Sequence, residues 1–250
     1  MTIQGCIFKT SKNKISKTDY VTLIIAAFIC GSGFALNSET VIIGSMLISP
    51  LLKPFTNMVI ALFKKKIAVA SLSLIQACIM STVTIIISII AGLSIVNFTP
   101  KLKNRIIDGI RAFKDLENKK KENDNIENTE TAETIYRKKT SGLSALFSRA
   151  GLIHDNLHEL MFALIISICG GILLARSHCE ESTLNTTIIG IGISTSILPP
   201  MIAAGIFGGV SVSHQENGLT LRHCLNCASV TGLNILGIYV AYWITLWFTW

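Results

Sequence analysis

The stretch from Ile67 to Val96 contains no charged residue. A run of more than about 18 apolar residues is long enough to form a helix that crosses a lipid bilayer. Only 15% of the whole chain is charged, whereas soluble domains have about 25% charged residues, and the charges crowd between long apolar runs. The sequence therefore predicts an all-α membrane protein.

Six apolar segments are predicted to be transmembrane helices. They are Tyr20–Leu36, Thr40–Leu62, Ile67–Val96, Leu160–Ala175, Thr186–Val210 and Cys224–Trp250. We expect a basic cytoplasmic tail over residues 1–18, a first membrane repeat over 19–96, a charged connection over 97–159 and a second membrane repeat over 160–250. The connection is expected to be partly disordered and to contain amphipathic helices.

The second and fifth segments carry matching motifs. Ile-Ile-Gly opens both, ending at Gly44 and Gly190, and a proline follows ten residues later, at Pro54 and Pro200. Proline inside a helix removes a backbone hydrogen bond, and in lipid the freed groups survive only where protein or a hydrated cavity shelters them. We therefore predict that both helices are broken at proline and that the breaks meet inside the bundle. The structural alternative is that the prolines only kink two helices for packing. Because each repeat has three segments, the second repeat enters the membrane from the opposite side, as in the inverted repeats of transporters.

Two membrane topologies remain open at this point. Six spans place both termini in the cytoplasm, because the short loops around Lys64–Lys66 and Arg176 are basic and those on the other side are not. The connection 97–159, with twelve Lys and Arg residues, then lies outside. If the second and fifth segments are re-entrant, the connection is cytoplasmic instead.

One part of the connection has the pattern of a basic amphipathic helix. Between Pro100 and Leu116, apolar residues recur at helical spacing among lysines and arginines, at Leu102, Ile106, Ile110 and Phe113. Such a helix can lie on a membrane surface, and the alternative is a helix in a solvated linker. Lys119 to Thr134 has almost no apolar residue, which predicts disorder.

The first proline motif is also a family signature. Gly44–Leu52 (GSMLISPLL), followed by Pro54, resembles the GAMLISPLMGP signature of the bacterial uncharacterised hydrophobic domain family, domain of unknown function 389. Pro199-Pro200 is similar to its second hallmark, and Asn234 lies where the last span of the family often has asparagine. The resemblance covers most of the apolar segments and implies a multi-pass protein of the bacterial inner membrane, without implying a substrate. Lys53 departs from the signature, which usually has a small residue there.

The candidate pathway residues come from the two predicted breaks. They are Ser49, Pro50, Lys53, Pro54, Asn57, Ser194, Thr195, Ser196, Pro199 and Pro200. Lys53 is the charged member, and an ionisable residue at bilayer depth costs about 2.5–3.5 kcal/mol on insertion scales, so it normally has a partner or a use. It is interpreted as a cation that attracts an anionic solute, and the structural alternative is a lysine that snorkels to the membrane surface.

Four further residues are candidates for helix packing: Gly44, Gly190, Gly192 and Asn234. Small residues let helix backbones approach closely in a membrane, and an asparagine can bond between helices for about 0.6 kcal/mol.

These features favour a transporter- or permease-like protein for a small solute, with anions favoured by Lys53. The alternative is a non-transporting membrane scaffold that organises lipid or partners through the basic connection. No enzyme is expected, because no aspartate occurs within the six segments and no GxSxG, HExxH or phosphate-loop motif is present.

Metal, cofactor and nucleic-acid binding are not expected either. His154, His158 and Glu159 do not have the HExxH spacing, and the pair Cys224 and Cys227 lacks a second pair. The net charge of +7 comes from basic residues that flank apolar segments, where acidic lipid headgroups lie. The expected partners are the bilayer and a small solute, and oligomerisation is left open.

Overall fold

The computed structural model describes residues 15–63, 65–121, 134–151, 161, 164–173, 183–213 and 217–249. The described residues form helices and the turns between them, with no strand among them. The helices are α1 (Lys17–Ala35), α2 (Glu39–Ile48), α3 (Leu52–Phe63), α4 (Ile67–Phe98), α5 (Pro100–Lys121), the 3-10 turn η2 (Ser141–Leu143), α7 (Ser144–Gly151), α9 (Thr183–Ser213) and α10 (Asn217–Thr249). Two shorter helical pieces lie at residues 134–140 and at Leu164–Leu173.

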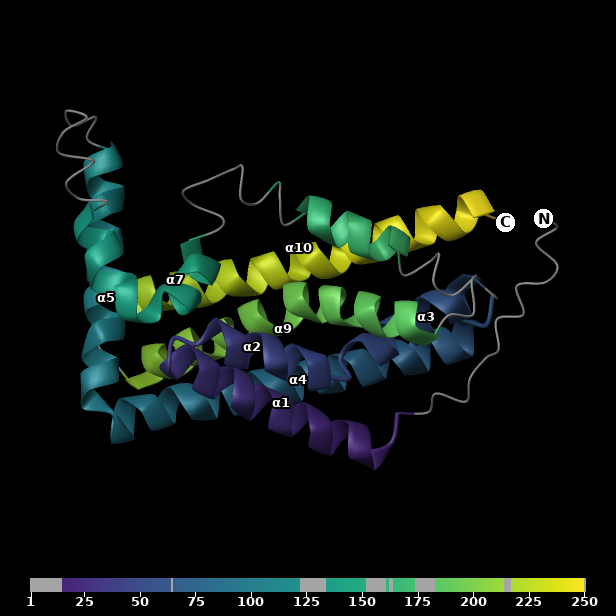
Figure 1. Ribbon diagram of the computed structural model, residues 1–250, viewed down its shortest axis with the longest axis horizontal. Coiled ribbons are helices and arrows are strands. Elements are labelled where there is room, and N and C mark those ends of the chain that lie inside the picture. Colours follow the sequence, from purple (N-terminus) through teal and green to yellow (C-terminus); the bar gives the residue numbers. More distant parts are fainter. Residues whose placement is uncertain are drawn as a thin grey trace.

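The long helices lie side by side in one bundle, and α5 runs across one end of it (Figure 1). α4 packs along α9, and α9 packs along α10. α1 contacts α2, α4 and α9, while α3 contacts α4 and α10. The two halves of the chain therefore share one core, with α4 and α9 at the centre.

Three helices are long and apolar enough to cross a membrane among the residues that the structure describes. They are Lys17–Ala35, Ile67–Ile95 and Thr220–Thr245. α2, Leu164–Leu173 and Ile197–Val212 are apolar but shorter. The chain is a helical membrane protein. The described residues contain three candidate spans, whereas six are predicted from the sequence. The second segment is divided into two short helices, and the fourth and fifth segments are only partly described.

Pro199 and Pro200 lie inside α9, which is continuous from Thr183 to Ser213. The prediction of a broken fifth helix is therefore wrong. Proline lacks an N–H, so the carbonyls of Thr195 and Ser196 lose their usual donors, yet such helices persist in membranes when neighbouring helices enclose them. Both prolines are buried, and α9 is held along its length by α4 and α10.

The contact between α4 and α9 depends on three glycines: Gly92, Gly205 and Gly209. A Cβ added to Gly92 would lie 2.6 Å from the carbonyl oxygen of Ile206, and one added to Gly209 would lie 2.5 Å from that of Ile89. Side chains at these positions would hold the two backbones apart, so the glycines permit the close approach of α4 and α9.

Gly44, which we expected to permit helix packing, has no such neighbour. A Cβ added there would meet no atom within 4 Å. The side-chain surroundings of Gly190 and Gly192 fall outside the described residues, although their backbones lie in α9. Asn234 of α10 is buried and accepts a hydrogen bond from Ser167 Oγ at 3.0 Å, which joins the Leu164–Leu173 helix to α10.

The charged connection contributes to the core. Ile106, Ile110 and Phe113 of α5 are buried, as are Leu146 and Phe147 of α7. Asn37, in the turn after α1, accepts hydrogen bonds at Oδ1 from Ala145 N and Ser144 Oγ, at 3.2 and 3.3 Å. The connection is therefore docked on the end of the bundle, through the buried side chains of α5 and α7 and through the hydrogen bonds to Asn37.

An aromatic cluster lies where the connection meets α9 and α10. The buried imidazole of His223 has ring centroids 4.9, 5.4 and 6.3 Å from those of Phe113, Phe207 and Phe147. Tyr136 packs against Phe113 and Phe147. The disorder expected for Lys119–Thr134 does not extend to residues 119–121, which belong to α5, and residues 122–133 fall outside the described part of the chain.

We predict that Gly209→Ala lowers the free energy of unfolding by about 1–3 kcal/mol, the usual cost of overpacking. The matched control is Gly44→Ala, which should be neutral or stabilise the protein by about 0.5–1 kcal/mol, because alanine is the better helix former. Thermal unfolding of both purified variants in detergent measures the difference. Equal melting temperatures for the two would show that α4 and α9 do not meet at Gly209.

The arrangement of the helices also predicts a topology. α2 and α3 together lead from the α5 end of the bundle to the opposite end (Figure 1), and Lys65 lies in the turn between the end of α3 and the start of α4. A cysteine placed at Lys65 and one placed at Lys101, each in a chain whose own cysteines are replaced by serine, should react with an impermeant thiol reagent from opposite sides of the membrane. Labelling of both positions from one side would contradict this crossing and support a re-entrant second segment.

Candidate functional site

The break between α2 and α3 occupies Ser49, Pro50 and Leu51. Ser49 has an extended backbone, with φ −68° and ψ 122°, because a residue that precedes proline is disfavoured in the helical region. The chain then turns at once into α3: Lys53 N donates to the Pro50 carbonyl at 3.1 Å, and Leu51 N donates to Ser49 Oγ at 3.5 Å. The signature motif thus forms a short turn that brings Lys53 to the start of a new helix.

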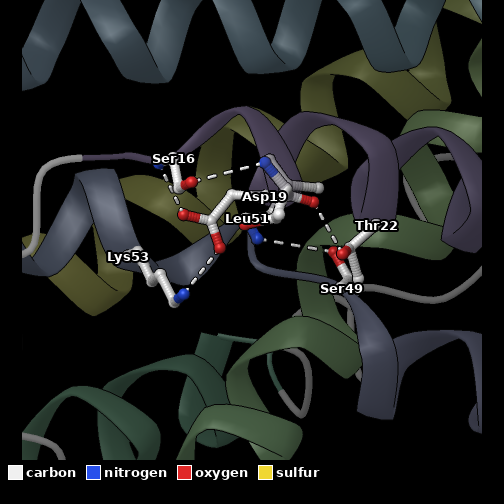
Figure 2. Close-up of polar contacts among 7 residues, drawn as sticks. Ser16, Asp19, Thr22, Ser49, Leu51 and Lys53 are labelled. Atoms are coloured by element: carbon white, nitrogen blue, oxygen red, sulfur yellow. Dashed lines mark hydrogen bonds and ion pairs between the residues drawn. The ribbon is translucent and has the colours of Figure 1, made fainter.

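An ion pair joins this break to α1. Lys53 Nζ lies 2.6 Å from Asp19 Oδ1, as Figure 2 shows. The second carboxylate oxygen, Asp19 Oδ2, accepts a hydrogen bond from Ser16 N at 2.9 Å, and Ser16 Oγ accepts one from Thr18 N at 3.4 Å. Asp19 therefore both caps α1 and pairs with Lys53.

The two members of the pair differ in exposure. The side chain of Asp19 is 14% exposed, whereas that of Lys53 is 49% exposed. The Asp19 side chain is thus mostly covered by the protein, whereas about half of the Lys53 side chain is exposed. Lys53 also lies at the opposite end of α3 from the Lys65–Lys66 turn, and a helix of 12 residues is about 18 Å long. The position is thus separated from that turn by the full length of α3.

Asp19 was missed by the sequence analysis. The first apolar segment in the sequence begins at Tyr20, and Asp19 lies just outside it. The spacing of Ser16 and Asp19 is that of a capping box, a signal that starts the helix at Lys17 and places the carboxylate in its first turn. No local signal identifies Lys53, 34 residues further along, as its partner.

The other pathway candidates lie in the break and in α9. In the break, Pro50 and Pro54 are buried, while Ser49 and Asn57 are partly buried. The backbones of Ser194, Thr195 and Ser196 lie in α9 next to the buried Pro199 and Pro200, but their side chains fall outside the described residues.

The two proline segments meet inside the bundle. α9 contacts both α2 and α3, and Leu51 of the break shares one core cluster with Leu198 of α9. On the other side of α3, Tyr239 of α10 donates its hydroxyl to the Phe55 carbonyl at 3.4 Å. The break is therefore enclosed by α1, α9 and α10, with apolar contacts toward α9 and the ion pair toward α1.

Metal chemistry finds no support in the described part of the chain, where no three His, Cys, Asp or Glu side chains lie close enough together to hold an ion. His154, His158 and Glu159 fall outside the described residues. Cys227 is buried, one helical turn from His223 in α10.

A family model described as "Domain of unknown function (DUF389)" matches residues 46–240. The chain belongs to this family. The DUF389 match begins in α2 and ends in α10, so it includes the break, α9 and the connection between them, and it confirms the resemblance drawn from the Gly44–Leu52 motif. Comparison with curated proteins and with solved structures finds no match.

A double-mutant cycle tests the ion pair. Asp19→Asn and Lys53→Gln, made singly and together, should give a coupling energy of up to about 1 kcal/mol, as for ion pairs with an exposed member. Asp19→Asn should destabilise more than Lys53→Gln, because it also weakens a helix cap that contributes about 1 kcal/mol. Chemical unfolding in detergent measures all four proteins.

The control cycle pairs Lys53→Gln with Glu39→Gln, at the far end of α2 from the break. These two changes should be additive, since distant sites do not couple. A coupling energy of zero between Asp19 and Lys53 would mean that the two side chains do not pair in the folded protein.

Proposed function

We propose that this protein is a transporter or permease for a small anionic solute, and that Lys53 at the α2–α3 break attracts the solute. The observation that carries the proposal is the half-exposed side chain of Lys53, placed at an interrupted helix in a helical membrane protein. Ionisable side chains within membrane segments mark solute and ion pathways, and interrupted helices commonly form the substrate sites of transporters.

The N-terminus of α3 supports an anionic solute. α3 begins at Leu52, and the N-terminus of a helix carries a partial positive charge from its unpaired N–H groups. Lys53 adds a full charge at the same place. A solute at the break would thus meet two sources of positive potential from one helix.

Asp19 pairs with the Lys53 ammonium when no solute is bound. A charge removed from water needs a partner, and Asp19 supplies it at 2.6 Å. An anion that binds Lys53 must compete with this carboxylate. Loss of the Asp19 charge should therefore strengthen anion binding, and loss of the Lys53 charge should weaken it.

The proposal includes the finer architecture inferred from the sequence. The first unit consists of α1, the interrupted pair α2 and α3, and α4; the second consists of the Leu164–Leu173 helix, α9 and α10. Each unit has three segments, so the two are proposed to have inverted topology in the inner membrane of a bacterium. The extensive contact of α4 with α9 supports a shared pathway between the units.

Flux measurements in proteoliposomes test the proposal. Wild type should carry at least one of chloride, nitrate, sulfate, phosphate or acetate faster than protein-free vesicles do. Lys53→Gln should lower its apparent affinity about tenfold, equivalent to about 1.4 kcal/mol, and Asp19→Asn should shift it in the opposite direction. Lys65→Gln, at the other end of α3, is the control and should behave like wild type.

Two results would contradict the proposal. One is wild-type protein, folded in the vesicles, that carries none of these anions. The other is an unchanged apparent affinity in the Lys53→Gln variant.

A second candidate function, a non-transporting scaffold for lipid or partners, is favoured by the charged connection. α5 runs across the end of the bundle, and its charged residues Lys101, Arg105, Asp108, Arg111, Lys114 and Asp115 are exposed. Deletion of residues 122–133 would abolish recruitment of a partner under this function, and would leave anion flux intact under the first.

A further inference from the structure

A charged surface separate from the break lies on α5. This helix begins at Pro100, directly after α4 ends at Phe98 and the chain turns at Thr99. It then runs across the bundle and not along it (Figure 1). Its apolar side is used by the fold, because Ile106 and Ile110 are buried. The basic residues Lys101, Arg105, Arg111 and Lys114 are exposed.

The ends of the neighbouring helices indicate the height of α5 relative to the bilayer. Leu36 follows α1, Phe98 ends α4 and Val212 lies near the end of α9, and their side chains are 73%, 83% and 76% exposed. Large apolar side chains exposed together at one end of a membrane bundle belong in lipid. In a bilayer that covers these side chains, α5, which starts two residues after Phe98, would lie at the adjoining headgroup level, with its axis along the membrane surface.

The charge of α5 determines which headgroups suit it. Five basic residues lie between Pro100 and Asp115, against the two acidic residues Asp108 and Asp115, so the net charge of this stretch is 5 − 2 = +3. Each lysine or arginine near an acidic membrane surface contributes about 1 kcal/mol of attraction. Acidic phospholipids carry the complementary charge, whereas zwitterionic phosphatidylcholine does not.

The same helix has a hollow of about 310 Å³, lined by Asn104, Ile107, Asp108 and Arg111. A guanidinium binds phosphate oxygens through two parallel hydrogen bonds, and the asparagine amide can donate another. Asp108 can only accept when ionised, so a headgroup that fits beside it must also carry a donor, such as a hydroxyl. A phosphoglycerol headgroup has both the phosphate and the hydroxyls.

We infer that α5 binds acidic phospholipids at the membrane surface, and that its hollow holds a phosphoglycerol headgroup. Arg111 and Asn104 bind the phosphate, Asp108 accepts from a glycerol hydroxyl, and Lys101, Arg105 and Lys114 attract the surrounding acidic headgroups. The inference does not depend on the proposed transport function, because it concerns a different surface.

The experiment compares the full chain in nanodiscs of phosphatidylcholine with the full chain in nanodiscs that also contain phosphatidylglycerol. Phosphatidylglycerol should raise the melting temperature of wild type. Added salt should reduce the rise, because the Debye length falls to about 3 Å at 1 M. The variant with glutamine at Lys101, Arg105, Arg111 and Lys114 should lose at least half of the rise. The control variant, with glutamine at Lys65 and Lys66, should keep it.

Two further measurements examine the hollow itself. Native mass spectrometry of wild type should find phosphatidylglycerol retained in preference to phosphatidylcholine, whether or not the four-residue variant folds. Arg111→Gln should abolish that preference, whereas Lys114→Gln, a matched change outside the hollow, should leave it. An equal rise in melting temperature for wild type and the four-residue variant, or no preference in the mass spectra of wild type, would overturn the inference.

Discussion

Close contact between α4 and α9 brings the two halves of the chain together. Gly92 on α4 and Gly205 and Gly209 on α9 permit it, because a Cβ at any of these positions would collide with the opposite helix. In lipid the hydrophobic effect does not drive helices together, so association depends on such close packing and on interhelical hydrogen bonds. α1 and α3 each contact both members of this pair, whereas α2 and α10 pack against α9. The position of the break, and hence of Lys53, follows from this contact.

The prolines interrupt one membrane segment and not the other, although proline removes a backbone donor in both. Pro50 follows a helix of only 10 residues, and the chain leaves the helical region at Ser49. Pro199 and Pro200 lie within a helix of 31 residues that is enclosed by α4 and α10, and the helix continues through them. Both segments lack the same backbone donors. The two segments therefore differ in the length and neighbours of their helices, and not in the donors that proline removes.

This difference marks what the sequence can and cannot reveal. The membrane class follows from uncharged runs such as Ile67–Val96, and the family follows from the motif around Ser49 and Pro50, because both signals are local. The partnership of Lys53 with Asp19 joins two helices and is visible only in three dimensions. The same is true of Gly44 and Gly209, which look alike in sequence but differ in whether a neighbouring helix lies above them. The burial of Phe147 could not be predicted either, since a short apolar pattern in a charged connection is equally consistent with a solvated helix.

The aromatic cluster around His223 joins the charged connection to the membrane helices. Phe113 and Phe147 come from the charged connection, whereas Phe207 and His223 come from the membrane helices. Detaching α7 would uncover these rings, so residues 141–151 fold with the bundle and do not form a separate extramembrane module.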